Sequence, residues 1–415
     1  MLFNTQSNTM TNRQIETTWD DQSKGTLKTQ LIESETPALQ PGEILVKLLY
    51  VPMHGSFWLA THPEGIHPRK EEFLSQGRFV FGNGGVAKVV DTTLDERDFR
   101  KGDYVCIFGH IPCRRYDCYA CTVLHRYSEC DFGESSILGH GKGSAEGTYA
   151  EYAVLPRHSY EICFRKEESP SPTILKSFMF GFLFADVRNA LTRHMDSLRM
   201  RRMLLVGAGF SGMIAAYIHN RTCPESKIFV VDSSLEHLAK LKSIDPEGIE
   251  TYHLPNSIAV ELNSRHQHVG FRHELSSVIN DISEKMHAHF GGRGCNLLFD
   301  SSSGNTTPIW DNPQILSPTA HCIPFGFGSQ YILLSKELIQ MSGLTIMMSR
   351  GVGNIRNRKE VIELIKAGAA KFIDEKLLAG TKELHGIDAA AGFINEMQDP
   401  PRQLHEISHA YISFK

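Results

Sequence analysis

The hydrophobic pattern divides the chain into a region of short apolar runs and a region in which longer helical segments alternate with strands. From Leu27 to about Pro156, apolar runs rich in β-branched residues are separated by glycine, proline and charged residues. Runs of this length between turn signals predict β-strands. We therefore expect a mainly β region, whose clearest runs are residues 42–51, 84–91, 102–109 and 147–156.

From about residue 175 the pattern becomes that of an α/β fold. Residues 201–221 indicate a strand, a glycine turn and a helix, and residues 227–234 the next strand. This βαβ order is typical of a parallel sheet. The segment 245–273, with two prolines, four histidines and no clear period, predicts an irregular insertion. Further strands are predicted at 295–302, 321–328, 344–350 and 409–415, and helices at 273–290 and 359–372, the latter ending near Gly368.

These changes in pattern predict an α/β protein with the following organisation. Residues 1–24 are expected to be a polar, mobile tail, and they lack the basic and apolar regions of a secretory signal. A β-rich domain at 25–172 precedes a doubly wound parallel-sheet domain at 173–348, and residues 349–415 return to the first domain. No window has the 18 or so apolar residues that a membrane span needs, so we expect no membrane partner.

Charge and cysteine content narrow the functional class. The 43 Lys and Arg residues nearly balance the 47 Asp and Glu residues, which argues against nucleic acid and favours a small-molecule ligand. Five of the nine cysteines fall between Cys106 and Cys130, so they do not form a disulfide framework spread along the chain. This clustering predicts metal ligation in a reducing, cytoplasmic compartment.

The strongest motif is the glycine turn at residues 207–212, which follows an apolar strand and opens a helix. Its first glycine permits a tight turn, the second allows close approach of a pyrophosphate, and the third allows the helix to pack on the strand. The helix N-terminus favours an anion. The turn therefore predicts a dinucleotide site, the alternative being a glycine-rich βα turn without a ligand.

Asp232 ends the next strand, twenty residues after Gly212, where a carboxylate accepts hydrogen bonds from an adenosine ribose. A carboxylate there repels a 2′-phosphate, and no arginine follows it closely, so the sequence favours NAD(H) over NADP(H). We assign to the cofactor site Gly207, Gly209, Phe210, Ser211, Gly212, Asp232 and Ser233.

Four of the clustered cysteines have the spacing C-x4-C-x2-C-x8-C in a polar loop. Four thiolates on one loop close a tetrahedral zinc site with no open position, which is typical of structural zinc. The alternative is that they are reduced core residues. We expect one structural zinc ion, held by Cys113, Cys118, Cys121 and Cys130.

Together these motifs resemble the medium-chain dehydrogenase/reductase superfamily, of the zinc alcohol dehydrogenase type. The shared features are the four-Cys lobe, the segment 147–156, the glycine turn with its acid, and the segments 291–304 and 343–368. The resemblance implies a chaperonin-10-like β-rich catalytic domain, a Rossmann domain that binds NAD(H), and a homodimer or homotetramer. The lobe departs from the family's usual C-x2-C-x2-C-x7-C spacing.

The resemblance also locates the positions at which the family holds a catalytic zinc ion. His54, Asn83 and Phe182 align with these positions, and they do not form a zinc ligand set. We therefore expect metal-free chemistry, with Ser56 at the family's hydroxyl relay, His54 beside it, and Asn83 contacting substrate. The alternative for His54 is a structural hydrogen bond to the backbone.

The leading functional hypothesis is an NAD(H)-dependent oxidoreductase that interconverts a small alcohol and a carbonyl compound, in a biosynthetic pathway, without catalytic zinc. Loss of the Lewis acid leaves a second chemistry open, the conjugate reduction of an enone-type C=C bond, in which hydrogen bonds hold the enolate oxygen. A third hypothesis is a dinucleotide-binding or redox-sensing protein without turnover.

Overall fold

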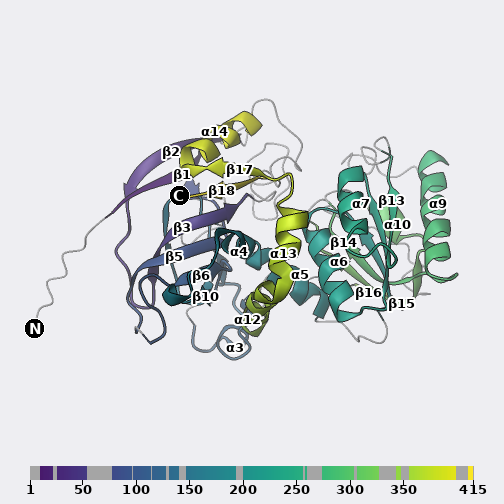
Figure 1. Cartoon of the computed structure of the whole chain (residues 1–415), viewed down its shortest axis with the longest axis horizontal. Helices are drawn as coiled ribbons and strands as arrows, with labels where there is room; N and C mark the ends of the chain where they lie inside the picture. The colour runs from purple at the N-terminus through teal and green to yellow at the C-terminus, as the bar shows by residue number, and fades with distance from the viewer. Residues whose placement is uncertain are drawn as a thin grey trace, which may run out of the picture. The chain divides into compact units, whose positions relative to one another are not determined.

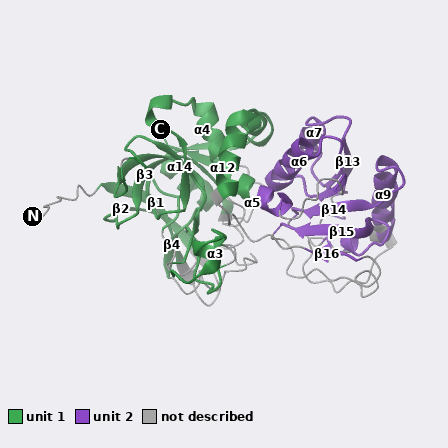
Figure 2. Ribbon diagram, turned by 90° about the horizontal axis from the view of Figure 1, so that it is seen from below, with its two compact units in different colours: residues 1–185, 351–415 green, residues 186–350 purple. Residues whose placement is uncertain are grey.

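The computed structural model divides into two compact units, which are described one at a time (Figure 1 and Figure 2). Unit 1 consists of residues 1–185 and 351–415, and unit 2 of residues 186–350. No helix in the described part of the chain is long and apolar enough to cross a membrane. The structure describes residues 10–21, 26–53, 77–95, 97–113, 115–127, 130–139, 146–192, 200–255, 258, 273–302, 306–326, 343–346, 355–398 and 410–414.

Unit 1 is built on a sheet of seven strands in the order β10-β6-β5-β3-β18-β17, with β9 also pairing with β3. The apolar runs expected between Leu27 and Pro156 supply four of these strands, β3, β5, β6 and β9, and the predicted C-terminal strand supplies β18. The strands are β3 (Ile44–Pro52), β5 (Gly85–Thr92), β6 (Tyr104–Ile107), β9 (Tyr152–Leu155), β10 (Tyr160–Phe164), β17 (Lys382–His385) and β18 (Ala410–Ser413).

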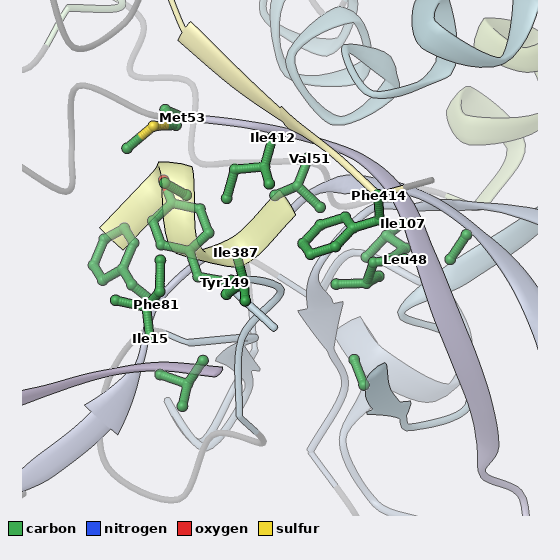
Figure 3. Close-up of a cluster of buried hydrophobic side chains, with 14 of the residues drawn as sticks. Ile15, Leu48, Val51, Met53, Phe81, Ile107, Tyr149, Ile387, Ile412 and Phe414 are labelled. Carbon is green, nitrogen blue, oxygen red and sulfur yellow. The ribbon is translucent and has the colours of Figure 1, made fainter. Parts of the chain in front are cut away.

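The core of unit 1 lies between this sheet and helix α14 (Gly386–Gln398). Figure 3 shows Ile387 of α14 in the same cluster as Val51 and Ile412 from the paired strands β3 and β18. All three side chains are at least 99% buried. Since burial of such a side chain contributes about 1.5–3 kcal/mol, this contact ties the C-terminal segment to the N-terminal strands.

The N-terminal segment corrects the expectation of a mobile tail at 1–24, because Thr11–Asp21 forms strand β1. It pairs antiparallel with β2 (Thr26–Glu35) and with β4 (Arg78–Val80). Ile15 is buried, and the buried amide of Asn12 exchanges two 3.0 Å hydrogen bonds with the backbone of Tyr152. The strand thus buries a hydrogen-bonded Asn12 in place of an apolar residue, so it lacks the apolar pattern that would identify it in the sequence.

Unit 2 is a parallel six-stranded sheet in the order β13-β12-β11-β14-β15-β16, which confirms the doubly wound fold. The strands are β11 (Arg202–Val206), β12 (Lys227–Asp232), β13 (Ile249–His253), β14 (Cys295–Asp300), β15 (Leu316–Pro324) and β16 (Thr345–Ile346). The helices are α6 (Phe210–Thr222), α7 (Leu235–Lys242), α9 (His273–His289) and α10 (Thr307–Trp310).

Strand β13 lies inside the segment 245–273, which the sequence predicts to be irregular. Its Ile249 and Tyr252 are buried, and the strand runs parallel to β12. Only a few residues long and flanked by prolines, it lacks the continuous period that identifies longer strands. The prediction is therefore wrong for Ile249–His253, while residues 256–257 and 259–272 lie outside the described residues.

The boundary between the units falls later than the predicted 172/173 division. Helix α4 (Pro172–Phe178) belongs to unit 1, and helix α5 (Gly181–Thr192) contains the division after Ala185. The ammonium group of Lys176 lies 3.0 Å from Glu383 Oε2 and 3.1 Å from the Tyr411 hydroxyl. These contacts hold α4 against the C-terminal strands of unit 1. The sequence pattern assigns α4 to the second domain because it is helical, like the segments of unit 2.

The helix predicted to end near Gly368 continues past it. Helix α12 (Ile355–Leu364) is followed by helical turns at 365–369, α13 (Ala370–Phe372) and turns at 373–377. Gly368, at φ 127°, interrupts the helical backbone, and the helix resumes because Ile373 and Leu377 are buried beyond it. Packing thus extends the helix through a residue that usually ends one.

Candidate functional site: a nucleotide turn and a four-cysteine lobe

The glycine turn of unit 2 connects β11 to α6, as predicted. Gly207 has φ 90°, a conformation that side chains disfavour. A Cβ at Gly212 would lie 2.1 Å from the carbonyl oxygen of Gly207, whereas a Cβ at Gly209 would meet nothing within 4 Å. Gly209 is also the N-cap of α6 and has no side chain to cap the helix. The turn therefore presents open backbone at a helix N-terminus, which suits a phosphate.

Asp232, at the end of β12, lies against this turn. Its Oδ2 accepts a 2.6 Å hydrogen bond from the backbone N–H of Ala208, and its Oδ1 accepts one of 2.6 Å from Ser234. The side chain is only 15% exposed, and His237 Nδ1 lies 4.0 Å from Oδ1. The structure thus fixes the carboxylate that the sequence assigns to the ribose, and adds a histidine beside it.

Two further residues support the turn from the end of β14. Ser301 Oγ donates a 2.7 Å hydrogen bond to the carbonyl oxygen of Gly207. Asp300 is buried and accepts hydrogen bonds from the side chains of Ser302, Thr306 and Trp310. Burial raises the pKa of Asp300, against these hydrogen bonds. Sequence reasoning missed both residues, although the carboxyl ends of parallel strands share one edge of the sheet.

In unit 1, Asn83 lies between two glycines in a loop that leads into β5. Asn83 is buried, with 6% of its surface exposed. Its side-chain oxygen Oδ1 accepts no hydrogen bond from the described residues. The loop is held closely, because a Cβ at Gly109 would lie 2.2 Å from the Asn83 carbonyl oxygen, and Thr148 Oγ1 donates to the Gly84 carbonyl oxygen at 2.9 Å. An unsatisfied buried amide oxygen is costly, so this position suits a polar ligand.

The structure places a histidine and Phe182 together near this loop. His110 starts strand β7 (His110–Ile111), directly after Gly109, and its ring stacks on Phe182 with centroids 5.7 Å apart and 17° between planes. Phe182 is the residue that the resemblance aligns with the third zinc-ligand position. His54 and Ser56 lie outside the described residues, so their proximity to Asn83 stays a prediction.

The four cysteines of the lobe converge, although they come from a loop whose helix α3 (Tyr119–Thr122) is a single turn. The Sγ atoms of Cys113, Cys118, Cys121 and Cys130 all lie within 4.8 Å of one another. Tetrahedral zinc–thiolate geometry requires sulfur–sulfur distances of about 3.8 Å, and Cys118 and Cys130 are 3.8 Å apart. The lobe therefore fits a zinc ion, despite its longer sequence spacing.

The environment of one thiol, Cys130, supports this fit, whereas burial raises the pKa of Cys113 and Cys121. Burial raises the pKa of the Cys130 thiol, but three backbone N–H groups of the following turn outweigh it and lower the pKa to about 6. Backbone N–H groups around a thiolate are the usual outer support of a metal ligand. Near the lobe, strand β8 (Ser136–Ile137) pairs with β7.

A buried arginine connects the lobe to the sheet of unit 1. The guanidinium of Arg358 lies 5.3 Å from the ring centroids of both Phe108 and Tyr127, and it donates to the carbonyl oxygen of His158. Tyr127 belongs to the hydrophobic cluster of the lobe. The sequence gives little sign of this contact, since Arg358 appears there as one basic residue in a polar helix.

Comparison with known proteins agrees with this architecture. Residues 40–165 match the alcohol dehydrogenase GroES-like domain. The chain is 28% identical over 131 residues to an L-threonine 3-dehydrogenase from Thermococcus kodakarensis, a match that covers 31% of this chain and 33% of that protein. The match thus spans about a third of the length of this relative.

Solved structures share the whole fold at low sequence identity. An alcohol dehydrogenase from Thermotoga maritima superposes with a TM-score of 0.73 at 15% identity, covering 98% of this chain and 100% of that one. A short-chain alcohol dehydrogenase from Escherichia coli CFT073, complexed with NADH, has a TM-score of 0.66 at 17% identity and covers 97% and 99%. The chain therefore contains an alcohol dehydrogenase GroES-like domain at residues 40–165, and its overall fold is that of solved alcohol dehydrogenases.

Proposed function

We propose that the protein is an NAD(H)-dependent oxidoreductase that interconverts an alcohol and a carbonyl group of a small molecule without a catalytic zinc ion. The observation that carries the proposal is the carboxylate of Asp232, hydrogen-bonded to the N–H of Ala208 in the glycine turn. This arrangement joins an anion-binding helix start to an acceptor for ribose hydroxyls. Similarity to proteins named dehydrogenases, one of them complexed with NADH, supports the same reaction class.

In this proposal unit 2 holds the nucleotide. The backbone around Gly209 would contact the pyrophosphate, and Asp232 would accept from the adenosine ribose. When bound, the nicotinamide group would supply or accept the hydride. Asp232 discriminates against a 2′-phosphate because its oxygens are already oriented and its charge repels a phosphate.

Unit 1 would handle the substrate oxygen and its proton. We assign proton transfer to Ser56 and His54 and a polar substrate contact to Asn83, whose Oδ1 accepts no hydrogen bond from the described residues. The stacked rings of His110 and Phe182 form an apolar surface near Asn83 that would limit access of water. The four-Cys lobe would hold zinc for structure, since its four thiols leave no open ligand position.

Nucleotide binding tests the cofactor part of the proposal. The change Asp232→Ala should weaken NADH binding by about tenfold, since it removes charge-assisted hydrogen bonds to the ribose. NADPH should bind the variant as well as NADH does, whereas the wild-type protein should prefer NADH. Fluorescence titration of both nucleotides measures this, and an unchanged preference in the variant would contradict the role of Asp232.

Turnover tests the chemical part. The wild-type protein should oxidise NADH in the presence of a ketone or an aldehyde, or reduce NAD with an alcohol, and L-threonine belongs in the panel because of the named relatives. Ser56→Ala should lower kcat more than it raises KM if the hydroxyl acts in the transition state. Turnover of enones alone would replace carbonyl reduction by conjugate reduction, and saturable NADH binding with no turnover of any compound would refute the enzyme proposal.

A further inference from the structure

A cavity of about 670 Å³ lies in unit 2 at the amino ends of its parallel strands. The glycine turn and Asp232 follow the carboxyl ends of the same strands, so the cavity lies at the opposite edge of the sheet. Its volume is in the range of small-molecule sites. The walls come from the starts of β11 and β14, the first half of β15 and the end of α9, all in unit 2. Figure 2 labels β14, β15 and α9.

The lining of this cavity is basic. Arg202, Arg293, His287 and His321 contribute to it, and no described lining residue is acidic. Arg202 Nε donates a 2.8 Å hydrogen bond to the carbonyl oxygen of Gly294, which fixes the guanidinium at the wall. No carboxylate in the described part of the chain forms an ion pair with either arginine. Burial and the nearby charge of Arg293 lower the pKa of Arg202, as expected for like charges without a counter-ion.

Neutral polar groups complete the lining. The amide oxygen of Asn296 accepts a 3.0 Å hydrogen bond from the backbone N–H of Arg202, so its NH₂ group remains as a donor. His321 Nδ1 is buried and has no hydrogen-bond partner among the described residues. The ring of His287 is held by a 2.6 Å contact between its Nε2 and the Gln314 carbonyl oxygen.

A large bulge in β15 forms one wall. Cys295 pairs with Leu316 and Leu297 pairs with His321, so two steps along β14 correspond to five along β15, and three extra residues are inserted. The bulge contains Pro318 and Thr319, which line the cavity, and Thr319 has φ 63°. An insertion in an interior strand interrupts the hydrogen-bond ladder, and bulges of this kind commonly serve to reshape a local surface.

We propose that this cavity binds a small molecule that carries a phosphate group, with Arg202 and Arg293 as its charged contacts. Two guanidinium groups without a carboxylate repel each other, and a bound dianion removes that repulsion. Guanidinium groups bind phosphate oxygens in pairs through parallel N–H donors. The Asn296 amide and the His321 ring supply further polar contacts. The site is independent of the proposed oxidoreductase function, because it uses none of the same residues.

Calorimetric titration of the full-length protein with inorganic pyrophosphate tests the proposal. We expect saturable binding that Arg293→Gln weakens at least about tenfold. Arg293 is exposed, so this substitution does not threaten the fold, whereas Arg202→Gln removes the contact with Gly294 and requires a check of unfolding temperature. Arg201→Gln is the matched control, because Arg201 pairs with Glu225 at 3.3 Å and does not line the cavity.

Three outcomes would overturn the proposal. Absence of binding at millimolar pyrophosphate would do so directly. Equal affinity in the wild type, R293Q and R201Q would mean that pyrophosphate binds elsewhere, as at the glycine turn. Tighter binding of citrate, which carries a similar charge on carboxylates, would overturn the assignment to phosphate.

Discussion

Hydrogen bonds within the protein decide how individual residues of the candidate site are presented. Each oxygen of Asp232 accepts one backbone N–H, from Ala208 and from Ser234, so the carboxylate is oriented before any ligand arrives. Preorganised acceptors bind without the cost of being ordered. Asn83 shows the opposite situation, since its buried Oδ1 has no donor among the described residues. The Asp232 carboxylate is oriented to accept further hydrogen bonds from a ligand, whereas the Asn83 amide oxygen needs a hydrogen-bond donor from a ligand.

A buried histidine in unit 2, His219, should make the free energy of unfolding depend on pH in the acid range. Burial lowers the pKa of His219 in α6 to about 4. Below a pH of about 6.5 the unfolded chain binds a proton that the folded protein does not, so the free energy of unfolding falls as the pH decreases from 6.5 to 4. The loss approaches about 1.4 kcal/mol per pH unit within this window. His219→Phe should reduce the slope of denaturant unfolding measured from pH 7 to 4 by this contribution, while His158, whose pKa burial also lowers to about 4, keeps its own.

The neighbouring variant Tyr217→Phe provides the control for this experiment. Burial raises the pKa of Tyr217, so the residue does not titrate in acid, and its replacement should leave the slope unchanged. A His219→Phe variant with the wild-type slope would show that other groups cause the acid sensitivity.

Among the elements, the β11 to α6 connection depends on two glycines for different reasons. Gly212 allows the helix to approach the turn, because a Cβ there would lie 2.1 Å from the Gly207 carbonyl oxygen. Gly209 borders open space and leaves the helix start uncovered. One glycine therefore serves packing and the other serves ligand access, as the glycine pattern itself implies.

Substitution by alanine should separate these two roles. Gly212→Ala should destabilise the protein by about 1–3 kcal/mol, because the backbone must shift to relieve the contact. Gly209→Ala should leave the unfolding temperature within about 1 °C of the wild type, while weakening NADH binding, because its methyl group occupies the approach of the pyrophosphate. Thermal unfolding and nucleotide titration of both variants measure the two effects. Equal destabilisation by the two variants would contradict the assignment.

For the whole molecule, the two units carry separate ligands in this interpretation. The lobe of unit 1 gathers four thiols within 4.8 Å in a loop with little secondary structure. Four thiolates this close repel one another unless a cation binds them, so the metal contributes to the fold of the lobe. Arg358 packs on Tyr127 of the lobe and on Phe108, which follows strand β6, and so connects the lobe to the sheet of unit 1.

Elemental analysis should find about one zinc ion per chain. Cys118→Ala should lower the zinc content to near zero and reduce the unfolding temperature by about 2–4 °C for each kcal/mol of lost stability. Cys223→Ala, which changes a buried cysteine outside the lobe, should keep the zinc. Two zinc ions per chain would contradict both the count and the metal-free catalytic site.

The sequence by itself determined the features that depend on neighbouring residues. The apolar runs of unit 1, the strand–turn–helix around Gly207 and the position of Asp232 could be predicted, because each is written in a short window with a fixed period or spacing. The cysteine spacing likewise predicted a cluster. Strand β1 could not be predicted, because its buried Asn12 is held by hydrogen bonds to Tyr152, which lies far along the chain.

Only the tertiary structure decided which distant residues meet. Three contacts join segments separated by tens or hundreds of residues. Ser301 donates to Gly207, His110 stacks on Phe182, and Arg358 packs against Phe108. The bulge in β15 also follows from pairing with β14 and has no local signature. Local patterns specify elements through backbone geometry, whereas such contacts depend on how sheets and helices pack, which no short window encodes.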